Sequence, residues 1–260
     1  MPEGDTVHLS ARRLDDALAG KVLTRTDFRV PQHAIADLSG KVMSGVIARG
    51  KHILMRIDDV TLHTHFKMEG EWHLYRHGER FRGPGHQVRV VLETDDWVAV
   101  GFRLGIIELV PASREDEIVG HLGPDLLGPD WDAEIALKNL TADGERPISD
   151  VLLDQRVMAG LGNVYKSELC FLSGLDPWTS VAAISDPAAL IDRAKRVMEA
   201  NRNTGMQITT GENRPGRRQW VYGRGGEPCR RCGTPISRRA DPGDRVTYWC
   251  PTCQPPNFAN

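Results

Sequence analysis

The sequence predicts an α+β multidomain fold, with an N-terminal helix plus antiparallel β-sandwich, a helical domain and a small cysteine-rich unit at the C-terminus. Three observations support this expectation. Short strand-like segments follow one amphipathic helix, longer helical segments follow a proline-rich joint, and four of the five cysteines lie near the end of the chain. A chain of 260 residues that is 40% hydrophobic can bury two cores and a small appendage. No segment approaches the roughly 18–20 uninterrupted apolar residues of a membrane span.

The first region, residues 1–122, is predicted to combine the helix with the sandwich. Apolar residues recur at positions i, i+4, i+7 and i+11, which places one apolar face on a helix that begins near Asp5 and ends at Gly20. The hydrophobic pattern then shortens, and Gly, Pro and Asp-Asp separate the segments at the spacing of an all-β sandwich or barrel. The predicted strands are residues 22–28, 42–48, 52–57, 61–66, 72–75, 88–92, 97–102 and 106–110.

The second region, residues 123–215, is predicted to be helical and to begin with the proline-rich joint at residues 123–130. Its helices are expected at residues 131–140, 147–154, 163–172 and 187–201. Asp186 is expected to cap the last helix, with Pro187 at its first position. The Gly-Leu-Gly-Asn sequence at residues 160–163 would let backbone N–H groups approach an anion. An ordinary packing joint between two helices explains this sequence at least as well.

The third region, residues 216–260, contains two Cys-x2-Cys pairs. The four thiols belong to Cys229, Cys232, Cys250 and Cys253. Two thiolate pairs on two tight turns present four soft ligands tetrahedrally, which predicts a zinc ribbon with one structural Zn²⁺. Residues 235–236 and 246–249 are expected to form its hairpin. Disulfides are the alternative, but the N-terminus lacks the apolar core of a secretory signal, so a reducing, cytoplasmic location is expected. Cys170 is expected to be a buried small residue.

Charge is unevenly distributed along the chain. The formal net charge is -2, yet residues 201–260 contain ten arginines, no lysine and four acidic residues, a net charge of +6, which leaves -8 for the rest. This asymmetry is typical of an anion-binding end on an otherwise acidic protein. A solvated arginine-rich surface is the alternative.

Pro2 would become a nucleophile on removal of the initiator methionine, because its secondary amine would then end the chain. An α-amino group titrates near ~7.7–8.0, so a fraction of it is unprotonated at neutral pH. Attack of this amine on an aldehydic carbon gives an iminium ion, which withdraws electrons from neighbouring bonds. Glu3 adjoins the amine and could shuttle protons. The alternative is an opening that has no catalytic role.

Four segments, in their order along the chain, resemble the Fpg/Nei family of DNA glycosylases. They are residues 2–4 (Pro-Glu-Gly), residues 49–51 (Arg-Gly-Lys), residues 152–163 and the cysteine-rich residues 226–254. The resemblance covers essentially the whole chain, and the opening is most like the Nei (endonuclease VIII) branch. It implies a helix–two-turn–helix element in the helical domain, damaged DNA as the partner, and a bifunctional DNA glycosylase/AP lyase of base excision repair.

The resemblance implies catalytic roles for Pro2, Glu3, Lys51 and Arg245. Pro2 would attack C1′ of the damaged nucleotide and remain joined to the sugar as a Schiff base after the base leaves. Glu3 would protonate the sugar or the departing base. Lys51 would assist β-elimination, and Arg245 would grip phosphate and support δ-elimination. The iminium ion acidifies the C2′ proton, so the 3′ phosphate leaves first and the 5′ phosphate second.

The resemblance also implies DNA-binding roles for Lys67, Met68, His121 and Asn163. A glycosylase extrudes its target nucleotide and fills the gap that it leaves. Met68 would be the apolar wedge, although a packed core position is the alternative. Lys67 would face a phosphate, Asn163 would hold a phosphate beside the lesion, and His121 stands where Nei enzymes carry a DNA-contacting arginine.

Three features depart from the family pattern. Thr6 stands where family members usually carry an active-site carboxylate, and Asp5 is a candidate substitute. Residues 103–104 (Arg-Leu) stand where Fpg enzymes have an Arg-Phe pair at the orphan base. Residues 211–218 leave little room for a loop that caps 8-oxoguanine. Oxidised bases are therefore the expected substrates, with pyrimidines favoured.

Other functions stay open at this point: a non-catalytic damage-binding member of the same fold, an 8-oxoguanine-preferring Fpg-type glycosylase, or a zinc-ribbon protein of translation or transcription. The presence of all four implied catalytic residues favours the enzyme, and a monomer is expected. His63 and His65 alternate on one strand face, which fits either an extra metal site or, with greater weight, ordinary strand positions.

Overall fold

The computed structural model describes residues 2–241 and 245–256, and it divides into two compact units. Unit 1 comprises Pro2 and residues 6–121, and unit 2 comprises the described part of residues 3–5 and 122–260. The three-domain division stays a prediction, with the helical region and the ribbon both inside unit 2. Within the described ranges, no helix combines the length and the apolar character that a membrane crossing requires.

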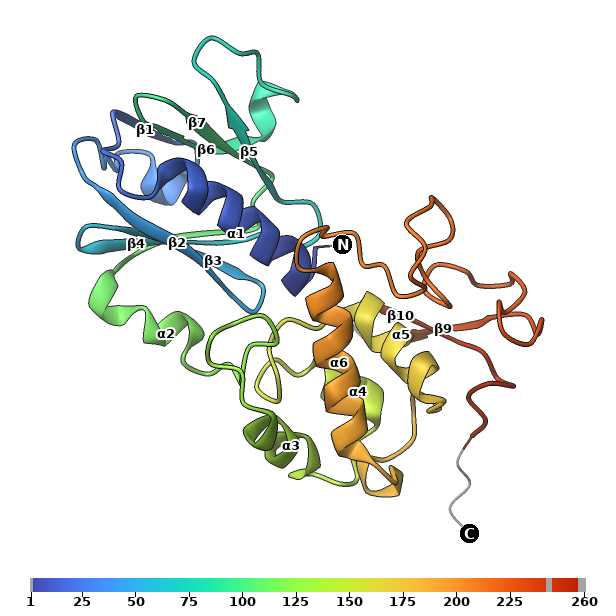
Figure 1. Cartoon of the computed structure of the whole chain (residues 1–260). Coiled ribbons are helices and arrows are strands. Elements are labelled where there is room, and N and C mark those ends of the chain that lie inside the picture. Colours follow the sequence, from blue (N-terminus) through green and yellow to red (C-terminus); the bar gives the residue numbers. More distant parts are fainter. Residues whose placement is uncertain (1, 242–244, 257–260) are drawn as a thin grey trace. The chain divides into compact units, whose positions relative to one another are not determined.

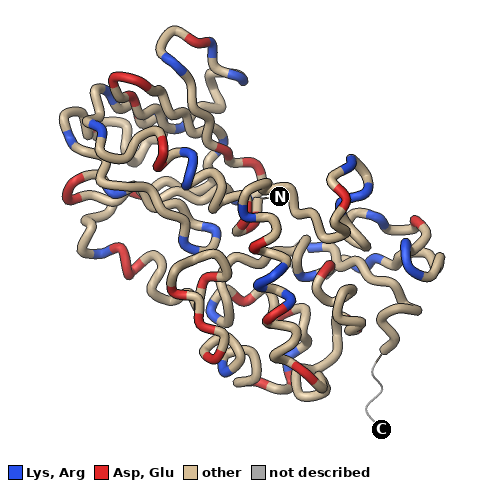
Figure 2. Tube along the Cα trace, viewed as in Figure 1, with Lys and Arg blue, Asp and Glu red and all other residues tan. Residues whose placement is uncertain are grey.

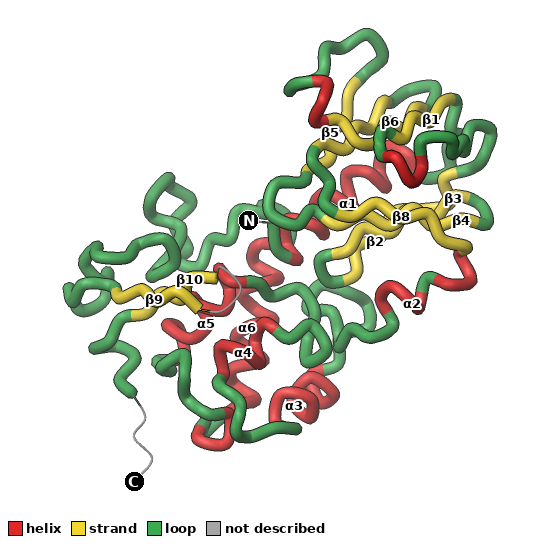
Figure 3. The backbone as a smooth tube through the Cα atoms, turned by 180° about the vertical axis from the view of Figure 1, so that it is seen from behind, coloured by secondary structure: helices red, strands yellow, loops and turns green. Residues whose placement is uncertain are grey.

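Unit 1 is a sandwich of two four-stranded antiparallel sheets, with α1 (Gly4–Leu18) running beside both (Figures 1 and 3). One sheet has the strand order β1-β6-β7-β5 and the other the order β2-β3-β4-β8. The bounds are β1 (Arg25–Phe28), β2 (Met43–Arg49), β3 (His52–Ile57), β4 (Val60–His65), β5 (Glu71–Tyr75), β6 (Val88–Glu93), β7 (Val98–Phe102), β8 (Ile106–Pro111) and the short α2 (Asp116–Val119). The predicted sandwich is thus confirmed.

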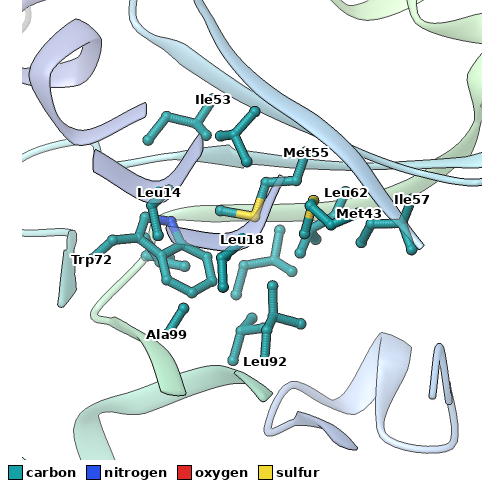
Figure 4. Packing of buried hydrophobic residues seen from close by; sticks show 14 of the residues in the cluster. Leu14, Leu18, Met43, Ile53, Met55, Ile57, Leu62, Trp72, Leu92 and Ala99 are labelled. Carbon is teal, nitrogen blue, oxygen red and sulfur yellow. The ribbon is translucent and has the colours of Figure 1, made fainter. Parts of the chain in front are cut away.

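The main core of unit 1 lies between the two sheets and under α1. Leu14 and Leu18 of α1 join Met55 of β3 and Leu92 of β6 in one buried cluster (Figure 4). A second, smaller cluster lies on the outer face of the sheet that contains β7, where Phe81 covers it. Both faces of β7 are therefore buried, which explains why its sequence is apolar throughout instead of alternating.

Unit 2 contains the helical part of the chain and the ribbon. Its elements are α3 (Ala133–Thr141), α4 (Ile148–Leu153), α5 (Asn163–Ser173), α6 (Pro187–Asn201), β9 (Ser237–Asp241) and β10 (Arg245–Trp249). Residues 154–162 join α4 to α5. α6 begins as predicted, because the Asp186 carboxylate accepts a hydrogen bond from the Ala189 N–H at 2.9 Å.

The ribbon packs against α5 and the loop that follows it. The rings of Trp178 and Trp249 meet edge to face, with centroids 4.7 Å apart, and the Arg239 guanidinium lies 3.5 Å above Trp178. The prediction of a first hairpin strand at residues 235–236 was wrong, since β9 begins at Ser237. β9 is polar and arginine-rich (Figure 2), so its pairing with β10, rather than an apolar alternation, determines where it lies.

Candidate active site

The side chain of Glu3 lies at the N-terminus of α5 (Asn163–Ser173) and is completely buried. Its Oε2 accepts hydrogen bonds from the N–H of Gly162 at 2.7 Å and of Tyr165 at 3.4 Å, and its Oε1 accepts one from Val164 N–H at 2.7 Å. A helix leaves such N–H groups unpaired at its start, and its dipole favours a negative charge there. The carboxylate is therefore held in one position, and it follows Pro2 directly in the chain.

Glycines in the α4–α5 joint allow this close approach. A Cβ atom on Gly162 would lie 2.5 Å from Cδ of Glu3, and one on Gly4 would lie 2.8 Å from Cα of Gly160. The Gly4 N–H donates to the Gly160 carbonyl at 2.9 Å. Gln155 braces the joint, because its Oε1 accepts from the Gly160 N–H at 3.0 Å while its Nε2 donates to two carbonyls nearby. The backbone N–H groups at the start of α5 thus bind the carboxylate of Glu3, which is an anion of the protein itself.

Asp5 anchors the first turn of α1. Its carboxylate is fully buried and accepts a hydrogen bond from the Tyr165 hydroxyl at 2.9 Å. Burial, followed by the charge of Asp5, raises the pKa of Tyr165 well above its usual range, so this hydroxyl remains a donor. These contacts give Asp5 a structural role. That Asp5 replaces the active-site carboxylate that family members usually carry at the position of Thr6 stays a prediction.

Lys51 lies at the tip of the β2–β3 hairpin. Arg49 pairs with His52, which leaves Gly50 and Lys51 as the two-residue turn. Gly50 has φ of 59°, a left-handed conformation that glycine adopts without steric cost. The turn therefore fixes where the Lys51 side chain starts, and the residue is half-buried.

Histidines from neighbouring strands form a hydrogen-bonded chain beside Lys51. His52 Nδ1 lies 2.8 Å from His63 Nε2, and His63 Nδ1 lies 2.8 Å from Oε2 of Glu108. Because a carboxylate oxygen accepts, Nδ1 of His63 donates to Glu108, and the other nitrogen of the neutral His63 ring then accepts from His52. His65 is T-shaped against His52, with centroids 5.0 Å apart. His63 and His65 thus have ordinary strand positions with hydrogen-bond and ring partners.

This cluster holds its histidines neutral. Burial, and then the neighbouring His63 and His65, lower the pKa of His52 to about 3. Burial, and then the charges of Lys67 and Lys51, lower the pKa of His65 to about 4. Lys51 of the implied catalytic set and Lys67 of the implied DNA-binding set therefore both lie close enough to His65 to act on its imidazole. The exposed His121 acts on His52 in the same way.

We expect unit 1 to lose stability as pH falls below about 6.5, the ordinary pKa of an unfolded histidine. The pKa values of His52 and His65 are depressed in the folded protein, so the unfolded chain binds protons that the folded protein does not. The free energy of unfolding should fall by about 1.4 kcal/mol per pH unit for each of these histidines. Urea unfolding between about pH 7 and pH 5, above the range where carboxylates titrate, measures this slope. His52→Gln should reduce this slope by about 1.4 kcal/mol per pH unit, which corresponds to one proton fewer taken up on unfolding. An unchanged slope would contradict the depressed pKa of His52.

Met68 lies on the turn between β4 and β5, at residues 67–69. The residue is 63% exposed, so the packed-core alternative does not apply. The Lys67 N–H donates to Nδ1 of His65 at 2.8 Å, which holds the start of the turn against β4. Lys67 and Met68 are therefore both exposed at the surface of unit 1. Exposure is what the predicted roles require, with Met68 as the wedge and Lys67 facing a phosphate.

Asn163, the first residue of α5, connects the helix to the ribbon. Its Nδ2 donates to the carbonyl of Val246 in β10 at 2.9 Å, while its buried Oδ1 has no hydrogen-bond partner among the described residues. Arg245 precedes Val246, begins β10 and is exposed. Unit 2 thus brings together Glu3, Asn163 and the strand that carries Arg245.

Four cysteines of the ribbon gather as a metal site. Sγ of Cys229 and Cys253 lie 3.9 Å apart, Sγ of Cys232 and Cys250 lie 3.4 Å apart, and all four lie within 4.8 Å of one another. A tetrahedron of thiolates about 2.3 Å from zinc has sulfur atoms roughly 3.8 Å apart. The donor set therefore fits one structural Zn²⁺. Across residues 2–241 and 245–256, no other cluster of side chains is arranged for a metal.

Sequence reasoning missed Glu168, which organises the loop after α6. Its buried carboxylate accepts backbone N–H bonds from Trp220, Val221 and Tyr222, each at 2.8 Å, and a hydroxyl bond from Thr209. The signal for such a role is a carboxylate directly before the apolar run Leu-Cys-Phe-Leu of α5, because a buried carboxylate requires partners. The sequence does not reveal which partners it has.

The chain matches three family models in order. Residues 1–103 match the formamidopyrimidine-DNA glycosylase N-terminal domain, residues 122–212 match the formamidopyrimidine-DNA glycosylase H2TH domain, and residues 226–256 match a zinc finger found in FPG and IleRS. This chain belongs to the Fpg/Nei family of DNA glycosylases. The family resemblance and the zinc ribbon predicted from the sequence are both confirmed.

Several Fpg/Nei relatives span nearly the whole chain. "Probable endonuclease 8 2" of Streptomyces coelicolor is 53% identical over 98% of this chain and 94% of its own length. "DNA-(apurinic or apyrimidinic site) lyase Nei2" of Mycolicibacterium smegmatis is 51% identical over 98% of this chain and 99% of its own length. A formamidopyrimidine-DNA glycosylase of Rhizorhabdus wittichii is 34% identical over 98% of this chain and 100% of its own length. The higher identities to the endonuclease 8 and Nei2 enzymes agree with the Nei-like opening.

Solved structures of the Fpg/Nei family share the fold. Lactococcus lactis formamidopyrimidine DNA glycosylase, non-covalently bound to AP-site DNA, gives a TM-score of 0.81 at 23% identity and covers 98% of this chain and 100% of its own. MutM in complex with DNA containing carbocyclic 8-oxo-G gives a TM-score of 0.81 at 25% identity with the same coverage. The predicted α+β multidomain fold is therefore confirmed.

Proposed function

We propose that this protein is a bifunctional DNA glycosylase/AP lyase of base excision repair that excises oxidised bases, with pyrimidines favoured. The observation that carries the proposal is the buried Glu3 carboxylate, which three backbone N–H groups hold immediately after Pro2 in the chain. Schiff-base chemistry needs a nucleophilic amine and a fixed group that transfers protons. The 53% and 51% identities to relatives named endonuclease 8 and AP lyase support the same reaction.

The catalytic roles follow the chemistry of the side chains. Pro2, freed of Met1, attacks C1′ of the damaged nucleotide, and Glu3 moves the proton that lets the base leave. Lys51, at a hairpin tip with a fixed backbone, assists the β-elimination. Arg245, exposed at the start of β10, holds phosphate and assists the δ-elimination. The ribbon presents this arginine, so Zn²⁺ has a structural role and takes no part in the reaction steps.

Binding of damaged DNA involves Lys67, Met68, His121 and Asn163. Lys67 and His121 both lie near His52, and the positive charge of Lys67 would attract a DNA phosphate to this part of unit 1. Met68 supplies an exposed apolar side chain for the gap left by the extruded nucleotide. Asn163 contributes to phosphate binding from the start of α5.

The preference for oxidised pyrimidines rests on two observations. The relatives of about 50% identity carry endonuclease 8 or Nei2 names, whereas the relative named formamidopyrimidine-DNA glycosylase is 34% identical. Residues 211–218 are a short, largely exposed segment of the connection between α6 and β9, and we infer that this segment leaves little chain to enclose a purine lesion. We further propose a monomer of three functional domains that acts on chromosomal DNA in the cytoplasm.

Borohydride trapping on an abasic duplex tests the proposal. We expect the protein without Met1 to form a covalent adduct with DNA, and peptide mass spectrometry should locate the adduct at Pro2. Reduction of the iminium ion makes this adduct permanent, so its yield reports the Schiff base directly. A version that keeps Met1 should trap no DNA through Pro2, because its proline nitrogen is part of a peptide bond.

Pro2→Gly is the matched variant, because it keeps a terminal amine but replaces the secondary amine of proline with a primary one. Turnover by this variant should be greatly reduced. Absence of any trapped species from the protein without Met1, under conditions where it binds DNA, would contradict the lyase assignment. An adduct located at Lys51 instead of Pro2 would contradict the assigned nucleophile.

A further inference from the structure

Met68 is the exposed apolar tip of a turn that is held firmly in place. The residue is 63% exposed, while Phe66 and Trp72 on either side of the turn are buried. A single exposed methionine is ordinary on a protein surface, so exposure alone assigns no role. The bonds and close contacts that fix residues 67–69 are what distinguish this turn.

The turn is held first by its own backbone. Lys67 has φ of 54°, a left-handed conformation that is unfavourable for a residue with a Cβ atom. Its N–H donates to Nδ1 of His65 at 2.8 Å, and the N–H of Gly70 donates to the Phe66 carbonyl at 2.9 Å. A Cβ atom on Gly105 would lie 2.3 Å from Cγ of Lys67, so the β7–β8 turn lies directly against this residue. A strained conformation persists only where its surroundings enforce it.

Arg103 holds the turn from the other side. Its Nε donates to the carbonyl of Glu69 at 3.2 Å, its Nη1 to Oε1 of Gln87 at 2.5 Å, and its Nη2 to Oε1 of Glu71 at 2.5 Å. The Arg103 N–H also donates to the Gln87 carbonyl at 2.9 Å. All three guanidinium nitrogens therefore bond to protein acceptors, one of which is the backbone carbonyl next to Met68.

Leu104, which follows Arg103, is turned into the protein. It is 6% exposed, and its Cδ1 lies so near Gly101 that a Cβ atom there would be 2.5 Å away. Leu104 also belongs to the main core of unit 1 together with Trp72. Leu104 is thus packed in the core and the Arg103 guanidinium is bonded to protein acceptors, whereas Met68 is an apolar side chain exposed at this edge of unit 1.

We propose that Arg103 is a positioning residue, which holds Met68 as a preformed wedge and does not read the base opposite the lesion. This inference rests on the proposed function. A wedge that unstacks a base pair works against the stability of the duplex. If the wedge is already rigid, DNA binding need not order it, and more of the interaction energy serves to unstack the bases. Arg103 acts through Met68 and makes no contact of its own with the bases.

The test compares Arg103→Ala with the unaltered protein on DNA that contains a non-cleavable tetrahydrofuran abasic analogue opposite 2-aminopurine. At saturating protein, the unaltered enzyme should raise the 2-aminopurine fluorescence severalfold as Met68 unstacks the base. Arg103→Ala and Met68→Ala should both lose most of this rise. The double variant should lose no more than either single variant, because both changes remove the same wedge.

Excision of thymine glycol supplies the second measurement. Arg103→Ala should lower the single-turnover rate on duplex DNA by about 10- to 100-fold, by a similar factor opposite each of the four bases. On single-stranded DNA, where nothing has to be unstacked, the change should stay below about threefold. Arg103→Lys keeps the charge but cannot span three acceptors, so it should behave like the alanine variant. Arg25→Ala, which alters an exposed ion pair on β1, is the control for a lost surface arginine.

Each other outcome overturns the inference. An equal loss on single and double strands indicates general damage to unit 1, and a loss confined to one opposite base indicates that Arg103 reads that base. A normal fluorescence rise in Arg103→Ala shows that the wedge needs no brace. Failure of the proposed function appears separately, as absence of trapping by the unaltered protein, because the fluorescence measurement requires binding and no chemistry.

Discussion

Replacement of Glu3 by glutamine is expected to lower the rate of base excision by about 10²- to 10⁴-fold at saturating protein. Glutamine keeps the size of the side chain but carries no charge and cannot transfer a proton. Its NH₂ group would also face one of the N–H donors from which Glu3 now accepts, at Gly162 or Val164. The free energy of unfolding should therefore fall by about 1–3 kcal/mol. Single-turnover excision and thermal unfolding separate the two effects.

Gly162→Ala is the matched variant for this prediction, because it displaces the carboxylate without removing it. The new Cβ atom would lie 2.5 Å from Cδ of Glu3, so we expect a loss of activity that approaches the loss in Glu3→Gln. In a Glu3→Ala background the same change meets no carboxylate, and its added effect should disappear. A Glu3→Gln rate within about tenfold of the unaltered protein, or equal effects of Gly162→Ala in both backgrounds, would contradict the assigned position of Glu3.

The regular elements were predictable where strong local signals bound them. β3 matches its predicted bounds of 52–57, because the Gly50-Lys51 turn and the two aspartates after Ile57 punctuate both ends. α6 matches its predicted bounds of 187–201, because Asp186 and Pro187 mark its start. β9 was missed because its residues are polar and carry no apolar alternation. Its position depends on pairing with β10 and on the cysteine cluster beside it.

The residues of the candidate site were predictable in identity but not in their contacts. Glu3 accepts hydrogen bonds from a helix start that lies 159 or more residues further along the chain, and no local sequence pattern predicts a contact between such separated residues. The His52–His63 pair is an intermediate case. The two-residue turn at residues 58–59 fixes the β3–β4 register, which places His52 opposite His65 and close to His63. The link to Glu108 depends on the further pairing of β8, which the sequence does not specify.

Removal of zinc is expected to unfold the ribbon and abolish DNA binding, while the helical core of unit 2 stays folded. Metal-binding energy is folding energy for so small a unit, on the order of 10–16 kcal/mol in isolated fingers. The ribbon core contains Cys229, Cys250 and Ile236 with Phe171 of α5, whereas the core around α3, α4 and α6 is a separate cluster. Limited proteolysis after chelation should therefore cut within residues 216–260 and leave the preceding chain intact.

Arg245→Ala is the control that separates the metal from the residue it presents. This variant should keep its zinc and its resistance to proteolysis, yet bind DNA more weakly, with a salt dependence reduced by about one unit for one lost phosphate contact. If Arg245 also supports δ-elimination, the products should shift toward the β-eliminated end even at saturating protein, because added protein restores occupancy but cannot replace a missing catalytic group. A chelated protein that still binds damaged DNA would show that the ribbon is dispensable. An Arg245→Ala product ratio equal to that of the unaltered enzyme would restrict this arginine to binding.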